Sequence, residues 1–180
     1  MKRRTALQVI AGGVAAEQLG AAQHHLVTLA QAPGSYKLQF FNPAQNEMLE
    51  QLAEMILPAD DHSPGAREAK VSLFIDLMIA HSSREAQELW TSGLKLVDAE
   101  AQKRFERPFS KCESAQREQI LTAMAAGEAE PKTALEQFFA RLKLMTIDGY
   151  YTSAIGIHRE LQYKGNAVLP EFPGCRHTDH

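Results

Sequence analysis

The spacing of apolar residues constrains the fold of this chain more than any other feature. Apolar side chains recur at steps of three and four, which places them on one face of a helix. Period-two alternation, the signature of strands, is scarce. The sequence therefore predicts an all-α fold, a compact bundle of about five to seven helices with an irregular, extended C-terminal tail. The clearest run of apolar residues is Leu135, Phe138, Phe139, Leu142 and Met145.

Capping residues predict where the helices begin. Asn42 is a favoured N-cap and Pro43 suits the first helical position, so a first helix starts there and is ended by Pro58. A second helix is expected over residues 66–81. Further helices are expected to start at Ser82 or Ser83, at Ser114 and at Thr133.

Length and composition indicate one domain. The chain has 180 residues, of which 44% are hydrophobic, and this is enough for a single core. Trp90 is expected in that core because its neighbours at helical spacing are apolar. The net charge of −3 offers no basic field for nucleic acid. No apolar run reaches the roughly 18 residues of a membrane span, so no transmembrane helix is expected.

Residues 1–22 have the features of an export signal, a basic start followed by apolar and then small residues. Arg3 and Arg4, with Leu7 three residues on, resemble a twin-arginine signal, which carries folded proteins across the bacterial inner membrane. This predicts a protein in the periplasm or on the periplasmic face of the inner membrane. An ordinary basic terminus on a cytoplasmic helix is the alternative.

Residues 23–41 are expected to form a linker or arm ahead of the helical domain, which takes up residues 42–180. Turn-forming residues at 32–35 interrupt any regular structure in the arm. Phe40 and Phe41 end it and are expected to anchor it to the core.

Residues 145–175 hold most of the special-backbone residues of the C-terminal third. Gly149 and Gly156 mark either a break in the last helix or a close approach of another backbone. Pro170 and Pro173 hold the tail extended. If the last helix continues, its apolar stripe is prolonged by Ile147, Tyr151, Ala154, His158 and Leu161.

Motifs of catalysis are missing from the sequence. There is no Gly-rich phosphate loop, dinucleotide fingerprint or serine nucleophile elbow. No haem-attachment motif occurs, and the two cysteines are too few for a four-thiolate cluster. Cys112 and Cys175 are able to pair in an oxidising compartment only if their Cα atoms lie within about 7 Å.

Carboxylate and histidine side chains leave two interpretations open. Asp60, Asp61 and His62 lie on one loop, where they either bind a metal or cap turns and helices. His158 suits a general acid or base, but the favoured interpretation is a core histidine that is hydrogen-bonded to a carbonyl or a tyrosine hydroxyl. Cys175 and His177 alone supply too few ligands for a metal.

The C-terminal unit is a candidate partner interface. A Gly-rich, aromatic helix end with an extended tail offers exposed backbone groups and anchoring rings. The same residues are equally suited to closing the bundle from within, so both readings stand. The candidate interface consists of Tyr150, Tyr151, Gly156, His158, Tyr163, Gly165, Asn166, Phe172, Pro173 and Gly174.

Two sets of short motifs occur in order along the chain. The first is Ile-Leu-Pro-Ala-Asp at 56–60, followed by Pro-Gly-Ala at 64–66. The second is Gly-Tyr-Tyr-Thr-Ser at 149–153, Glu-Leu-Gln-Tyr-Lys-Gly-Asn at 160–166 and Glu-Phe-Pro-Gly-Cys at 171–175. Together, over about residues 41–177, they resemble the gluconate 2-dehydrogenase subunit 3 family.

This resemblance implies a small accessory subunit with no catalytic, cofactor-binding or metal-binding residues of its own. Its partner would be a large FAD-containing subunit that oxidises sugars, sugar acids or alcohols, and a separate cytochrome c subunit with haem c often takes the electrons. The small subunit would aid folding, export and assembly of the large one. Two other classes stay open: a redox or metal-dependent enzyme using His158, Asp60 and His62, and a free-standing periplasmic binding module.

Overall fold

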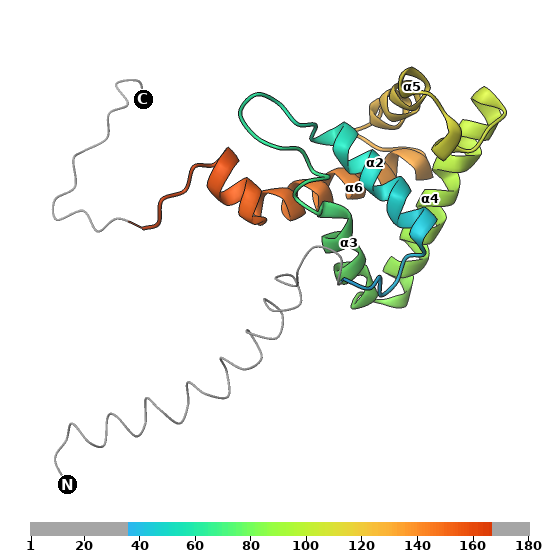
Figure 1. The fold of residues 1–180 in the computed structure, drawn as a ribbon. Coiled ribbons are helices and arrows are strands. Elements are labelled where there is room, and N and C mark those ends of the chain that lie inside the picture. Colours follow the sequence, from blue (N-terminus) through green and yellow to red (C-terminus); the bar gives the residue numbers. More distant parts are fainter. Residues whose placement is uncertain (1–35, 167–180) are drawn as a thin grey trace, which may run out of the picture.

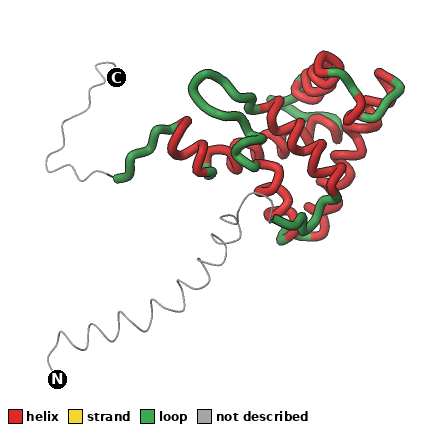
Figure 2. Tube along the Cα trace, in the orientation of Figure 1, coloured by secondary structure: helices red, strands yellow, loops and turns green. Residues whose placement is uncertain are grey.

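A computed structural model describes residues 36–166, and the regular structure in that range is helical (Figure 1, Figure 2). The prediction of an all-α fold with about five to seven helices is confirmed. A short 3-10 helix, η1, precedes α5, and a short π-helix, η2, follows α6. The elements are α2 (Pro43–Ile56), α3 (Val71–Ala80), α4 (Arg84–Phe105), η1 (Phe109–Lys111), α5 (Ser114–Ala125), α6 (Ala134–Tyr151) and η2 (Gly156–Glu160).

The central element of the bundle is α6. It contacts each of α2, α3, α4 and α5, so the last long helix joins the earlier ones into one body. Its inward face matches the apolar stripe that the sequence predicts as far as Leu142, and extends it to Tyr150. The buried residues of α6 are Phe138, Phe139, Leu142, Thr146, Gly149 and Tyr150.

Side-chain caps start three of the helices at the predicted positions. The Asn42 carboxamide oxygen accepts a hydrogen bond from the Gln45 backbone N–H at 2.9 Å, and the Gln45 side chain accepts one from the Asn42 N–H at 3.0 Å. Ser83 caps α4 and Thr133 caps α6. These contacts satisfy N–H groups that the first turn of a helix leaves without partners.

Two predicted helix starts are wrong. The helix expected over 66–81 begins only at Val71, because Lys70 has a left-handed backbone with φ of 59°, which a continuous helix does not permit. The cap of α5 is Glu113, whose side chain accepts the backbone N–H of Gln116, and Ser114 is the first helical residue. The Glu113 carboxylate, one position earlier, takes the place of the serine hydroxyl as the acceptor of the Gln116 N–H.

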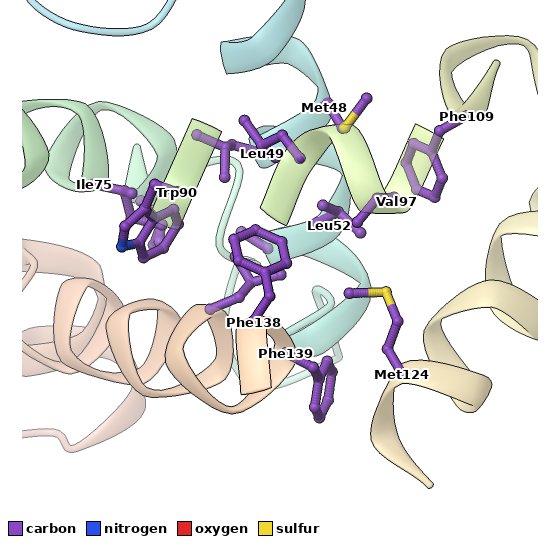
Figure 3. Close-up of a cluster of buried hydrophobic side chains, with 14 of the residues drawn as sticks. Met48, Leu49, Leu52, Ile75, Trp90, Val97, Phe109, Met124, Phe138 and Phe139 are labelled. Atoms are coloured by element: carbon purple, nitrogen blue, oxygen red, sulfur yellow. The ribbon is translucent and has the colours of Figure 1, made fainter. Parts of the chain in front are cut away.

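Buried side chains from several helices gather into one core, as Figure 3 shows for Trp90, Phe138 and Met124. Trp90 is only 4% exposed, as expected, and its ring meets that of Phe138 edge-on at 5.5 Å between centroids. Gly93 on α4 faces the same phenylalanine. A Cβ atom at Gly93 would overlap the Phe138 ring, so the glycine sets how closely α4 and α6 approach.

One buried carboxylate holds residues 36–41 against α3. Asp76, fully buried, accepts hydrogen bonds from the Tyr36 hydroxyl and the Gln39 N–H at 2.8 Å each. It also accepts the N–H groups of Phe40 at 3.0 Å and Phe41 at 2.8 Å. Burial, and then the hydrogen bond to Asp76, raises the pKa of the Tyr36 hydroxyl above its usual value. Phe41 is buried and Phe40 packs on the core, as expected.

The predicted continuation of the apolar stripe beyond Tyr151 is wrong. Ala154, His158 and Leu161 are exposed, because α6 ends at Tyr151. The Ser153 hydroxyl donates to the Tyr150 carbonyl at 2.6 Å and accepts the Gly156 N–H at 3.0 Å. A side chain that takes over backbone partners in this way turns the chain out of the helical direction.

No helix within residues 36–166 is long and apolar enough to cross a membrane. The Cys112 thiol is buried and lies 3.6 Å from the Pro108 carbonyl oxygen. The expected export signal with Arg3, Arg4 and Leu7 lies outside the described residues, and so does the tail with Cys175.

Candidate functional site

The loop between α2 and α3 meets η2 on one side of the molecule (Figure 1). His62 of the loop lies with its Nε2 3.2 Å from the Glu160 carbonyl oxygen and 4.0 Å from the Glu160 carboxylate. An imidazole N–H hydrogen-bonds the first of these, and a protonated ring also pairs with the second. Two segments far apart in sequence therefore form one surface.

Asp60 shapes this loop through hydrogen bonds to the backbone. Its Oδ1 accepts the N–H groups of His62 and Ser63, each at 2.8 Å. These two hydrogen bonds, that from Ser63 first, lower the pKa of the Asp60 carboxyl below its usual value. Asp60 thus has the turn-capping role, one of the two interpretations that the sequence left open. Among residues 36–166, no three His, Cys, Asp or Glu side chains gather as a metal site would require.

Tyr150 ties the end of α6 to the same loop. Its hydroxyl donates to the Pro64 carbonyl at 2.7 Å and lies 2.7 Å from the Ser63 hydroxyl. The Tyr150 side chain is only 5% exposed, so it lies in the core beneath the surface of the site. Its ring meets Tyr151 edge-on at 5.3 Å between centroids. The two contacts of the buried Tyr150 hydroxyl fix the loop relative to α6.

The π-helix η2 forms the second wall of the site. The Leu161 N–H donates to the Gly156 carbonyl at 2.9 Å, five residues back. Gly156 is buried, and a Cβ atom there would overlap the carbonyl oxygen of Tyr150. A close backbone approach is one of the two alternatives that the sequence left open for this glycine, the other being a break in the helix. Single π-turns are rare in proteins and are frequent at functional sites.

Beyond η2 the backbone doubles back on itself. Gln162 has a left-handed backbone with φ of 49°, and the Tyr163 N–H donates to the Ile157 carbonyl at 3.0 Å. The Tyr163 hydroxyl donates to the Asn166 side chain. Gly165, with φ of 94°, has a conformation that favours glycine. This turn holds Tyr163 and Lys164 beside η2.

A polar pocket of about 320 Å³ lies between the loop and this turn. Arg159 and Lys164 form no ion pair with any residue in the described range. Glu160 of η2 lies beside His62, and Asp60 and Asp61 precede His62 on the loop, so acidic groups adjoin the pocket as well. The residues that line the pocket are His62, His158, Arg159, Gln162, Tyr163 and Lys164.

The chemistry of this lining is that of hydrogen-bond donation. Guanidinium and ammonium groups donate only, and the imidazole, amide and phenol groups can donate as well. His158 is exposed, so the interpretation of it as a core histidine is wrong, because α6 ends before reaching it. Its role as an acid or base stays a prediction.

Comparison with known families decides where this chain belongs. Over residues 43–170 it matches the sequence model of a family described as gluconate 2-dehydrogenase subunit 3. The chain belongs to the gluconate 2-dehydrogenase subunit 3 family. No curated protein and no solved structure matches the chain. The family domain contains all the pocket residues, whereas the arm at 36–41 precedes it.

The residues predicted to form the partner interface of this family member are partly buried in the fold and partly exposed on its surface. Tyr150 and Gly156 are buried, and Tyr151 is half-buried, so these three serve the fold. Phe172, Pro173 and Gly174 lie outside the described residues. The exposed members are His158, Tyr163, Gly165 and Asn166, and the first two of these line the pocket.

Sequence analysis of this family member missed the cationic character of the site. Arg159 directly precedes the motif at 160–166 and Lys164 lies within it, but their convergence with His62 was not predicted. One feature of the sequence could have indicated the cationic lining: Arg159 and Lys164 lie close together in a chain of negative net charge. Leu161, which is 58% exposed, was also placed wrongly, on an inward face.

Proposed function

We propose that this chain is a non-catalytic accessory subunit of an FAD-dependent dehydrogenase complex of the gluconate 2-dehydrogenase type. The family match over residues 43–170 is the observation that carries the proposal. In this complex FAD belongs to a large subunit that oxidises a sugar, sugar acid or alcohol. Haem c belongs to a cytochrome c subunit where the complex has one. The small subunit aids folding and assembly of the large one.

Export with the large subunit is the second part of the proposal. Arg3, Arg4 and Leu7 support it, because a twin-arginine signal carries proteins that are already folded. The small subunit binds the folded flavoprotein in the cytoplasm, and the pair crosses the membrane together. The complex then works in the periplasm or on the periplasmic face of the inner membrane.

The surface around the pocket is proposed as the docking site for the large subunit. Tyr163 is 50% exposed and Leu161 58%, although both are large and apolar. Exposed aromatic side chains that stand beside a pocket are typical anchors of protein interfaces. The hydrogen bonds of Tyr150 hold the underlying loop and α6 together. Less conformational entropy is therefore lost when a partner binds to this surface.

Co-purification tests the complex. The full chain, tagged at its C-terminus, is co-expressed with the genes that flank its own, and we expect a yellow, FAD-containing partner in near-stoichiometric amount. Tyr163→Ala is expected to weaken capture about tenfold, which corresponds to about 1.4 kcal/mol. Leu96→Ala removes an exposed apolar side chain of α4, 37% exposed, and serves as the matched control. Helix content by circular dichroism should be unchanged in both variants.

Fractionation tests export. We expect the complex in the periplasmic or membrane fraction, and Arg3→Lys with Arg4→Lys should hold both subunits in the cytoplasm. A colourless monomer that stays in the cytoplasm with its arginines intact would overturn both parts of the proposal. Oxidation of gluconate by the isolated chain with a dye acceptor would overturn the non-catalytic role.

A further inference from the structure

We propose that residues 152–164 are a conformational switch, which alternates between the folded-back form of the structure and a regular helix that prolongs α6. In the folded-back form α6 ends at Tyr151, and η2 ends just before the left-handed Gln162. In the prolonged form one helix runs on to Lys164 and ends at Gly165. The inference goes beyond the accessory-subunit role and does not depend on it, because the switch belongs to the isolated chain.

The segment contains two places where a helix can end, and the structure uses the less favourable one. Gln162 has φ of 49°, and the Tyr163 N–H donates to the Ile157 carbonyl at 3.0 Å, as in a Schellman cap. A residue other than glycine is disfavoured in this conformation, because its Cβ crowds the backbone. Gly165 has φ of 94° and ends a helix without that crowding. Other contacts must therefore hold the earlier helix end at Gln162.

The break between α6 and η2 depends on a side chain. The Ser153 hydroxyl donates to the Tyr150 carbonyl at 2.6 Å and accepts the Gly156 N–H at 3.0 Å. No proline occurs in residues 150–166, so each residue after Tyr150 is able to join a regular helix. Gly156 lowers the helix propensity of the segment, which keeps the two forms close in free energy.

Glu160 has a different partner in each form. In the folded-back form its carbonyl oxygen lies 3.2 Å, and its carboxylate 4.0 Å, from Nε2 of His62. In a regular helix Lys164 follows Glu160 by four residues, the spacing and order at which a glutamate and a lysine attract each other best. The left-handed Gln162 lies between them and prevents this pair in the folded-back form. Lys164 accordingly pairs with no acid among residues 36–166.

His62 is the contact that opposes the prolonged form. Among residues 36–166, it makes the one hydrogen bond and the one ionic contact between the loop and η2. Asp60 and Asp61 form no ion pair with Arg159 across the pocket. A straightened helix would carry Glu160 away from the loop, so loss of the His62 contact favours the prolonged form.

An apolar stripe on the outer face of α6 shows what the prolonged form would present. Leu144 is 59% exposed, and the half-buried Ile147 and Tyr151 follow it at steps of three and four. Further steps of four and three reach Ile155 and His158, which a continuous helix would place on the same face. The folded-back form interrupts this stripe at Tyr151. The two forms therefore offer different surfaces to a partner.

Nuclear magnetic resonance of the isolated full chain tests the switch. Relaxation dispersion at residues 153–164 should detect exchange with a minor form whose Cα chemical shifts are helical as far as Lys164. Gln162→Gly removes the cost of the left-handed conformation and should lower the population of the helical form about tenfold. Gln162→Ile increases that cost, because a β-branched residue fits the conformation poorly, and should raise the population about tenfold.

Glu106 supplies the matched control. It too is left-handed, with φ of 56°, and it caps the end of another helix, α4. Glu106→Gly and Glu106→Ile change the same backbone cost there and should leave the exchange at residues 153–164 as it is in the wild type.

A double variant, Gln162→Ile with His62→Ala, should make the helical form the major one while the core signal of Trp90 stays unchanged. Folded-back or random-coil chemical shifts at residues 153–164 in this variant would overturn the proposal. If the variant does not fold, the wild type decides: no exchange there, or exchange that responds equally to the Glu106 variants, overturns it. Because these measurements need no partner, they leave the co-purification test of the accessory role untouched.

Discussion

At the scale of single residues, Asp76 shows how hydrogen bonds satisfy the oxygens of a buried carboxyl side chain. Its carboxylate receives three backbone N–H groups and one phenol hydroxyl, all from residues 36–41. These hydrogen bonds satisfy side-chain oxygens that burial has removed from water. Asp76 is therefore the link between the arm and the helical domain.

Replacing Asp76 tests this link. Asp76→Ala leaves buried N–H groups of the arm without an acceptor, so we expect the free energy of unfolding to fall by about 2–4 kcal/mol. Asp76→Asn retains one acceptor oxygen and should lose less. Urea denaturation measures both, and Asp148→Asn, an exposed acid on α6, is the control. A loss in Asp76→Ala no larger than in the control would contradict the structural role.

Gly93 lies where the packing of α4 against α6 leaves no room for a side chain. Gly93→Ala would gain up to about 1 kcal/mol of helix propensity on α4. The added methyl group would overlap the buried Phe138 ring, and overpacking typically costs about 1–3 kcal/mol. We expect net destabilisation of about 1 kcal/mol by thermal or urea unfolding. Phe138→Leu in the same chain should reduce the penalty, and a stabilised Gly93→Ala would contradict the packing.

Asp60 makes the loop sensitive to acid. Its pKa is lowered by the Ser63 and His62 N–H groups in the folded chain. A carboxyl with a lowered pKa stabilises the fold above its usual value of 3.8, and that stabilisation is lost as the pH falls through the lowered value. The amide signals of His62 and Ser63 should therefore shift with a midpoint below 3.8. Asp60→Asn keeps an acceptor and should abolish this titration; a midpoint above 3.8 would contradict the assignment.

At the scale of elements, η2 depends on one glycine. Gly156→Ala places a methyl group against the Tyr150 carbonyl, which is backbone and cannot rotate away. We expect η2 to move, the His62–Glu160 contact to break, and stability to fall by about 1–3 kcal/mol. The His62 ring signal reports the first effect and urea denaturation the second. Ala154→Ser, at an exposed position in the same turn, should change neither, and an unmoved His62 signal in Gly156→Ala would contradict the prediction.

At the scale of the whole molecule, residues 36–41 pack against the family domain, so we expect the two to unfold together. The family match begins at residue 43. The residues that hydrogen-bond to Asp76, including the buried Phe41, come before that position in the chain. A chain that starts at Asn42 loses these contacts, and we expect its melting temperature to fall by roughly 5–10 °C. A chain that starts at Tyr36 keeps them and is the control. Equal melting temperatures for the two chains would contradict this prediction.

Local chemistry in the sequence was sufficient for much of the fold. The caps at Asn42, Ser83 and Thr133 and the apolar face of α6 were predictable, because each depends on neighbours within one or two turns of a helix. The burial of Trp90 followed from the same periodicity. The family resemblance likewise depended on the order of short motifs along the chain.

Tertiary structure alone decided the rest. The acceptor role of Asp76 and the meeting of His62 with Glu160 depend on groups from separate segments of the chain. The end of α6 at Tyr151 exposed the residues that periodicity had placed inward. Spacing along a chain reports which residues can share a helix face, whereas a pocket is made by segments that meet only after the helices have packed.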